Sequence, residues 1–256
     1  MNILDQICNI KLKEVNLLKK KINFTKTPKV KPKKFLEELV KRNESNFNVI
    51  AEIKKRSPSK GLIRKDFKLF EIAEDYKKAG VKCLSILTEK DHFEGDITYI
   101  KKVKEKVDIP ILRKDFILDE WQIFESFYSG ADCVLLILAI LDDEKLKKFY
   151  NLSQELGMDV ICEIHNSEEL ERILKLNVRC IGINNRNLKT LEINPNTFNI
   201  LSRRIPDNVI KICESGINYN KQLYDYTKNG ADAFLIGETL MKSENIERTT
   251  KDLIKK

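Results

Sequence analysis

The chain has 256 residues, 42% of them hydrophobic and 34% charged, so it can bury the core of one large α/β domain or of two small ones. No apolar run approaches the roughly 20 residues of a membrane-spanning helix, the longest being Val134 to Leu141, and the N-terminus is too polar for a signal peptide. The net charge of +8 comes largely from residues 1 to 46, which hold 12 Lys or Arg against 5 Asp or Glu; such a Lys-rich segment is more typical of a solvated helical face than of a nucleic-acid-binding arm.

The first part of the chain predicts helices without strands. Apolar residues recur at helical spacing over Ile3 to Lys21 and over Lys33 to Arg42. We therefore expect residues 1–46 to form an N-terminal helical extension that packs on the body formed by residues 47–256.

From residue 47 onward, short β-branched runs alternate with amphipathic stretches, which is the pattern of repeated βα units. The predicted strands are Asn48 to Ile53, Cys83 to Leu87, Ile109 to Arg113, Cys133 to Ile137, Asp159 to Glu163, Cys180 to Ile183, Val209 to Cys213 and Ala233 to Ile236. The predicted helices are Phe70 to Ala79, Ile97 to Val107, Asp119 to Ser129, Asp143 to Leu156, Ser167 to Leu176, Pro195 to Arg203, Tyr219 to Lys228 and Leu240 to Ile254.

Eight such units in a chain of this length predict an α/β fold, a closed (β/α)8 TIM barrel, because a closed sheet leaves no exposed edge. A doubly wound open sheet is the structural alternative. No G-x-G-x-x-G follows any predicted strand, however, so the barrel is favoured.

The first predicted strand ends in two charges that share a face. Because side chains alternate along a strand, Glu52 and Lys54 point one way while Val49 and Ile53 point the other. The chain then enters a loop of small and basic residues, Ser57 to Gly61. This arrangement predicts the edge of an active site, with the loop as a candidate lid.

Polar residues also follow the later strands, and the carboxyl ends of barrel strands meet at the rim where active sites lie. At this rim the sequence places Lys114, Glu163, Asn184, Arg186, Glu214, Ser215 and Gly237. Alternation puts Lys114 on the side of Leu112, and Glu163 on the side of Ile161. Any one of these residues is compatible with a structural ion pair. Together they predict a polyionic catalytic site.

Two of the loops contain small residues suited to a phosphate. The seventh strand runs into Ser215 and Gly216, and the eighth runs into Gly237 and Glu238. Short loops at this place in a barrel present backbone N–H groups to phosphate, so a phosphorylated substrate is expected.

Metal and nucleophilic chemistry have little support in the sequence. The only histidines are His92 and His165, and no cysteine pair has C-x-x-C spacing. Five cysteines lie inside strand-like segments and are expected to be reduced core residues of a cytoplasmic protein: Cys83, Cys133, Cys162, Cys180 and Cys213. We expect no metal and no cofactor, which leaves acid–base and electrostatic catalysis by Lys and Glu.

Several motifs resemble those of the indole-3-glycerol phosphate synthase family of tryptophan biosynthesis, and the resemblance covers nearly the whole chain. The motifs are Ala51 to Lys55, Ser57 to Gly61, Ser85 to Thr88, Phe93 to Gly95, Leu112 to Ile117, Glu163 to His165, Gly182 to Leu188, Glu214 to Ile217 and Leu235 to Glu238. The resemblance implies the substrate 1-(2-carboxyphenylamino)-1-deoxyribulose 5-phosphate, whose pyrrole ring closes with loss of carbon dioxide and water.

The resemblance also implies roles for individual residues. Lys114 corresponds to the general acid that protonates the ribulose C2 carbonyl oxygen, and Glu163 corresponds to the general base for the later proton removal. Asn184 would hold the reacting hydroxyl groups, while Glu52 and Glu214 bracket the lysines. Phosphate would be bound by Lys54, Ser215, Gly216, Gly237 and Glu238. The remaining substrate contacts would come from Ser57, Lys60, Phe116, Arg186 and Leu188, with Ser57 and Arg186 near the anthranilate carboxylate.

Alternatives stay open at this point. The dehydration step could use Lys54 or Lys114. Another phosphate-binding barrel enzyme, such as phosphoribosylanthranilate isomerase, would be expected to use a Cys/Asp pair instead. A different class of protein would use the basic extension to bind nucleic acid or a partner beside an idle barrel. In the enzyme interpretation the extension packs over the barrel mouth, with Ile7, Ile10 and Leu17 facing the site or neighbouring helices, and another tryptophan-pathway enzyme is a possible partner.

Overall fold

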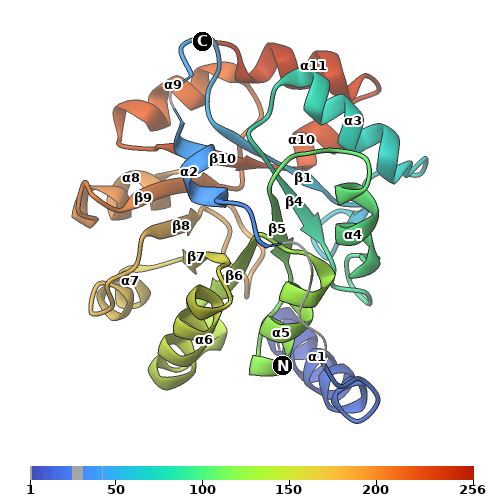
Figure 1. Ribbon diagram of the computed structural model, residues 1–256. Helices are drawn as coiled ribbons and strands as arrows, with labels where there is room; N and C mark the ends of the chain where they lie inside the picture. Colours follow the sequence, from blue (N-terminus) through green and yellow to red (C-terminus); the bar gives the residue numbers. More distant parts are fainter. Residues whose placement is uncertain (1, 25–30, 42) are drawn as a thin grey trace.

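The computed structural model describes residues 2–24, 31–41 and 43–256, and it confirms the predicted TIM barrel (Figure 1). Eight parallel strands close in the order β1-β10-β9-β8-β7-β6-β5-β4. Their bounds are Val49–Ile53 for β1, Cys83–Leu87 for β4, Ile111–Lys114 for β5, Cys133–Ile137 for β6, Asp159–Ile164 for β7, Cys180–Asn184 for β8, Ile210–Glu214 for β9 and Ala233–Ile236 for β10. Most of the predicted strand bounds therefore hold to within a residue.

Amphipathic helices surround the barrel and bury their apolar sides against its outer face (Figure 1). They are α3 (Leu69–Ala79), α4 (Thr98–Lys104), α5 (Glu120–Ser129), α6 (Asp143–Glu155), α7 (Ser167–Ile173), α8 (Asn196–Leu201), α9 (Asn220–Lys228), α10 (Glu238–Met241) and α11 (Ile246–Ile254), with short 3₁₀ turns η1 (Leu138–Ile140) and η2 (Ser202–Arg204). Across the described ranges, no helix is both long and apolar enough to cross a membrane.

The last predicted helix was wrong in one respect, because it is two helices. The chain leaves helical geometry after α10 and starts again at α11, where the Asn245 side chain accepts the backbone N–H of Arg248 at 2.9 Å. A side-chain cap of this kind favours a new helix start over continuation. The loop after β1 also differs from a plain loop, since it contains a two-stranded hairpin of β2 (Arg56–Ser57) and β3 (Gly61–Leu62).

The N-terminal segment forms α1 (Ile3–Lys19) and α2 (Phe35–Val40), while Arg42, the predicted end of the second helix, lies outside the described residues. Helix α1 lies beside α5 (Figure 1) and buries Ile7, as predicted. The prediction was wrong for Ile10 and Leu17, which are 38% and 60% exposed. They lie on the outer face of α1, because the helix is rotated so that Lys11 is buried against the barrel.

Helix α2 closes the opposite end of the barrel, where the strands begin. The carboxylate of Asp159, the first residue of β7, accepts the backbone N–H of Leu36 at 2.9 Å. Phe35 and Leu39 are fully buried in the same apolar cluster as the barrel interior. The extension therefore contacts both ends of the barrel.

Inward-facing side chains fill the barrel in layers, each contributed by alternate strands. The lowest layer is Cys83, Cys133, Cys180 and Ala233, and the next is Ile50, Leu112, Ile161 and Ile212. Two residues further along the strands of the second layer stand Glu52, Lys114, Glu163 and Glu214. The predicted alternation is thus confirmed, and apolar layers give way to a charged layer at the carboxyl ends of the strands.

Candidate active site

The charged layer is a ring of one lysine and three glutamates, which we call the charged ring (Glu52, Lys114, Glu163 and Glu214). The ammonium of Lys114 lies 3.3 Å from Glu163 Oε2 and 3.6 Å from Glu214 Oε2. The three carboxylate side chains are almost completely buried. Because strand register fixes their depth in the barrel, these groups converge without help from flexible loops.

Electrostatics within the ring favour a charged Lys114 and favour ionisation of Glu163 over that of Glu214. Burial opposes the charge of Lys114, but the neighbouring glutamates outweigh it and raise the pKa of Lys114 above its usual value. Burial also opposes ionisation of Glu163, yet the cations Lys114 and His165 lower the pKa of Glu163 well below its usual value. For Glu214, burial and the charge of Glu163 both raise the pKa. The two glutamates that face Lys114 therefore differ in protonation.

Two glycines make room for the carboxylates of the ring. A Cβ at Gly182 would collide with the carboxylate of Glu214, and one at Gly237 would collide with that of Glu52. Glu52 is also paired with Lys54, whose Nζ lies 2.5 Å from Glu52 Oε1. Burial opposes ionisation of Glu52, but Lys54 and Lys114 together lower its pKa.

A cavity of about 290 Å³ lies over the ring at the carboxyl end of the barrel. All the residues singled out from the sequence line it: Glu52, Lys54, Ser57, Lys60, Lys114, Phe116, Glu163, Asn184, Arg186, Leu188, Glu214, Ser215, Gly216, Gly237 and Glu238. The structure thus brings these side chains together, although their individual roles stay predictions.

One wall of the cavity is apolar, and sequence reasoning found only part of it. Phe93 and Phe116 face each other with ring centroids 6.1 Å apart. Ile3 and Leu4 of α1 also line the cavity, together with the anticipated Ile7. Helical spacing between Leu4 and Ile7 was the available signal, but it does not tell which body a helix face will meet.

The loops after β9 and β10 form the opposite wall. Ser215 and Gly216 both have positive φ, at 68° and 79°. A serine in this left-handed conformation is strained, and such strain is concentrated at functional sites. The Glu238 carboxylate is held by the cations of Lys242 at 2.6 Å, Arg186 at 3.6 Å and Lys60 at 3.9 Å. Any contact between Glu238 and an anion would therefore use its backbone N–H rather than its carboxylate.

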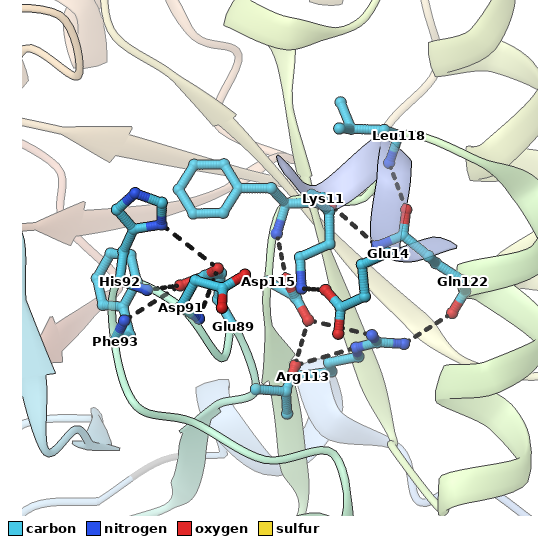
Figure 2. A network of polar contacts seen from close by, with 12 residues as sticks. Lys11, Glu14, Glu89, Asp91, His92, Phe93, Arg113, Asp115, Leu118 and Gln122 are labelled. Atoms are coloured by element: carbon cyan, nitrogen blue, oxygen red, sulfur yellow. Dashed lines mark hydrogen bonds and ion pairs between the residues drawn. The ribbon is translucent and has the colours of Figure 1, made fainter. Parts of the chain in front are cut away.

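Behind the apolar wall, a buried polar network fixes α1 to the end of β5 (Figure 2). Lys11 Nζ of α1 lies 3.3 Å from Asp115 Oδ1 and 2.7 Å from Glu14 Oε2. Asp115 also pairs with Arg113 at 3.1 Å and accepts the Thr88 hydroxyl at 2.6 Å. Since Asp115 follows Lys114 directly, the network supports the strand end that carries the lysine of the charged ring.

Comparison with known proteins bears on the chain as a whole. A family model described as indole-3-glycerol phosphate synthase matches residues 4–253. A protein of that name from Legionella pneumophila (strain Paris) is 44% identical over 255 residues, which are 99% of this chain and 98% of the relative. Another, from Endomicrobium trichonymphae, is 45% identical over 237 residues, which are 93% of this chain and 88% of the relative.

Solved structures add evidence on the fold alone. A 3-hexulose-6-phosphate synthase superposes with a TM-score of 0.65 at 16% identity, covering 81% of this chain and 98% of that one. A structure titled native KDPGal gives a TM-score of 0.58 at 14% identity, covering 83% of this chain and 94% of that one.

Proposed function

This chain belongs to the indole-3-glycerol phosphate synthase family, and from that premise we propose that its charged ring performs the family's ring closure by Lys/Glu acid–base catalysis. The chain is an enzyme of tryptophan biosynthesis, a carboxy-lyase with a phosphorylated small-molecule substrate. One observation carries the mechanistic proposal: a partly buried ammonium, Lys114, lies within 3.6 Å of two carboxylates beneath a cavity that has one apolar and one polar wall.

The proposed substrate, 1-(2-carboxyphenylamino)-1-deoxyribulose 5-phosphate, matches the polarity of the cavity. Its aromatic ring would lie against Phe93 and Phe116, near Leu188, and its phosphate would take the backbone N–H groups of the loops after β9 and β10. Lys54 would add a cation for the phosphate. Ser57 and Arg186 would contact the anthranilate carboxylate, and Lys60 would approach from the β2–β3 hairpin.

The first chemical step forms a carbon–carbon bond. The aromatic carbon that bears the carboxylate attacks the ribulose C2 carbonyl, while Lys114 donates its proton to the carbonyl oxygen as negative charge develops there. Carbon dioxide then leaves from the same aromatic carbon, and the electron pair of the broken bond restores aromaticity. The carboxylates around Lys114 keep it protonated until the carbonyl oxygen becomes basic enough to accept the proton.

The second step removes water. The hydroxyl group formed in the first step departs with a proton from a lysine, and Glu163 takes a proton from the methylene carbon next to the nitrogen, which completes the pyrrole ring. Asn184 would orient the hydroxyl groups. The lysine that serves this step is Lys54 or Lys114, since both line the cavity.

A direct assay tests the proposal. Purified protein is incubated with the substrate without added metal, and formation of indole-3-glycerol phosphate is followed by indole fluorescence. We expect turnover by the wild-type chain and a loss of at least about a hundredfold in Glu163→Gln. No product from the folded wild-type protein would disprove the activity, whereas full activity of Glu163→Gln would disprove only the assignment of the base.

The cellular compartment and the partners of the enzyme are also proposals. Free thiols at Cys83, Cys133, Cys162, Cys180 and Cys213 support a reducing compartment, and we infer the cytoplasm. We expect no nucleic-acid or membrane ligand, since the positive charge lies mainly in the extension. Another enzyme of the tryptophan pathway stays a possible protein partner.

A further inference from the structure

A histidine outside the proposed mechanism lies directly behind the charged ring. His165 follows Glu163 by two residues, and its Nε2 lies 3.1 Å from Glu163 Oε1. Its other ring nitrogen, Nδ1, lies 3.0 Å from Glu169 Oε2. The side chain is only 9% exposed and does not line the cavity, so it is not placed to contact a substrate.

We propose that His165, held by Glu169, is a positioning residue that keeps Glu163 ionised and oriented as the base of the reaction. The inference rests on the proposed role of Glu163, and it assigns the pair of residues behind that base a function of their own. Glu163 would then be held between two cations, with Lys114 on Oε2 and His165 on Oε1.

The positions of the two ring nitrogens favour a doubly protonated imidazole. A neutral histidine has one donor and one acceptor nitrogen, and an acceptor nitrogen facing a carboxylate oxygen would be repelled. Here both nitrogens of His165 lie close to carboxylate oxygens, which favours the charged form that carries hydrogen on both nitrogens. Burial opposes this charge, but Glu163 and Glu169 outweigh it and raise the pKa of His165 to about 9. Nε2 makes no aligned hydrogen bond within the described part of the chain, so its attraction to Glu163 is that of an ion pair.

The outer carboxylate is itself fixed by the start of α7. Glu169 Oε2 accepts the backbone N–H of His165 at 2.8 Å, and Oε1 accepts the side-chain amide of Asn166 at 2.9 Å. Asn166 caps the helix in return, since its Oδ1 accepts the backbone N–H of Glu169 at 2.9 Å. Reciprocal capping of this kind orders a helix terminus. The orientation of the base is thereby tied to a rigid helix end.

His165 also distinguishes two otherwise similar carboxylates. Glu163 and Glu214 both face Lys114, at 3.3 and 3.6 Å, and Glu52 adds a further negative charge from β1. The side-chain amide of Asn184 on β8 also stabilises ionised Glu163. Within the ring, Lys114 faces both Glu163 and Glu214, whereas His165 faces Glu163 and not Glu214. It therefore favours ionisation of Glu163, while Glu214 holds a proton more readily.

Replacing the histidine should move the acid limb of the pH profile. In His165→Gln we expect kcat/KM near pH 7 to fall about tenfold, mainly through kcat, because Glu163 is no longer held in orientation. The acid limb should rise by about one pH unit or more, because Glu163 loses a cation. His92→Gln is the matched control. That residue is also beside a buried glutamate, Glu89, at 3.6 Å, but it does not line the cavity, so its acid limb should coincide with that of the wild type.

A second variant acts on the opposite limb. Glu169→Gln keeps the imidazole but removes the outer charge, so His165 should lose its proton about one pH unit or more below the wild-type value of about 9. The acid limb of this variant should stay at the wild-type position, since His165 is still protonated there, and only the alkaline limb should move down. A residue that merely supported the fold would shift neither limb selectively.

The two variants keep the proposal testable if one of them fails to fold. An unmoved acid limb in folded His165→Gln would overturn the proposal, as would an unmoved alkaline limb in folded Glu169→Gln. Failure of the proposed base is a separate result, because it appears as retained activity in Glu163→Gln.

Discussion

Lys114 is the side chain on which the proposed chemistry converges. Its ammonium is partly buried and lies within 3.6 Å of two carboxylates, which raise its pKa above the usual value despite the cost of burial. A cation that stays protonated at neutral pH is suited to donate a proton at the moment when the carbonyl oxygen becomes basic. The charged ring thus keeps Lys114 protonated at the place where the proposed reaction transfers a proton to the substrate.

Replacement of this lysine should separate binding from turnover. In Lys114→Met we expect substrate affinity to stay within about tenfold of the wild type, because phosphate and aromatic ring are held elsewhere in the cavity, while kcat falls by at least about a hundredfold. Equilibrium binding and steady-state kinetics measure the two effects. A loss of binding as large as the loss of turnover would contradict the general-acid role.

The sequence did not predict where helix α1 packs, although the helix contributes to the cavity. It supplies Leu4 and Ile7 to the cavity wall and inserts Lys11 beside Asp115 (Figure 2). Burial would raise the pKa of Asp115, but Lys11 and Arg113 outweigh it and lower that pKa. We infer that residues 1–46 act as an extension of the barrel rather than as a separate binding arm.

Breaking this buried pair should destabilise the protein. In Lys11→Met the Asp115 carboxylate keeps Arg113 but loses the α1 cation, and we expect the free energy of unfolding to fall by about 3 kcal/mol. Lys13→Met on the exposed side of the same helix is the control, with an expected change within about 0.5 kcal/mol. Urea unfolding measures both variants. Equal stability of the two would mean that the pair does not hold α1 in place.

The barrel buries five free cysteines. Cys83, Cys133 and Cys180 supply three of the four side chains in its lowest layer, whereas Cys162 of β7 and Cys213 of β9 belong to the core cluster between the strands and the surrounding helices. Burial raises the pKa of all five. In the unfolded chain these thiols would ionise near pH 8.5, whereas the folded protein keeps them protonated.

Stability should therefore fall steeply at alkaline pH. Above about pH 8.5 the unfolded state binds fewer protons than the native state, so five thiols lower the free energy of unfolding by about 7 kcal/mol per pH unit. His165 acts in the same direction, since its contribution to the free energy of unfolding is complete below about pH 6.5 and is lost as the pH rises through about 9. Urea titrations at several pH values test this. Cys162→Ala should make the alkaline slope shallower by about 1.4 kcal/mol per pH unit, and an unchanged slope would refute the thiol origin.

Much of the fold and site follows from local patterns. Alternation along β5 and β7 determines that Lys114 and Glu163 face the same interior as Leu112 and Ile161, and the repeated βα pattern determines that all strand ends meet at one rim. These features depend only on backbone periodicity and chain order. The charged ring could for that reason be named without coordinates, whereas Phe116 and Leu188 were expected only from the family resemblance.

Other features depended on contacts between distant parts of the chain. Helical spacing in α1 defined which residues share a face, but the ion pair of Lys11 with Asp115 decided that Ile10 and Leu17 would face outward. The linkage from Glu169 through His165 to Glu163 likewise depends on where the start of α7 lies relative to the end of β7. A sequence period defines a face but not its partner, because the free energy of burial and ion pairing depends on which surfaces the closed barrel brings together.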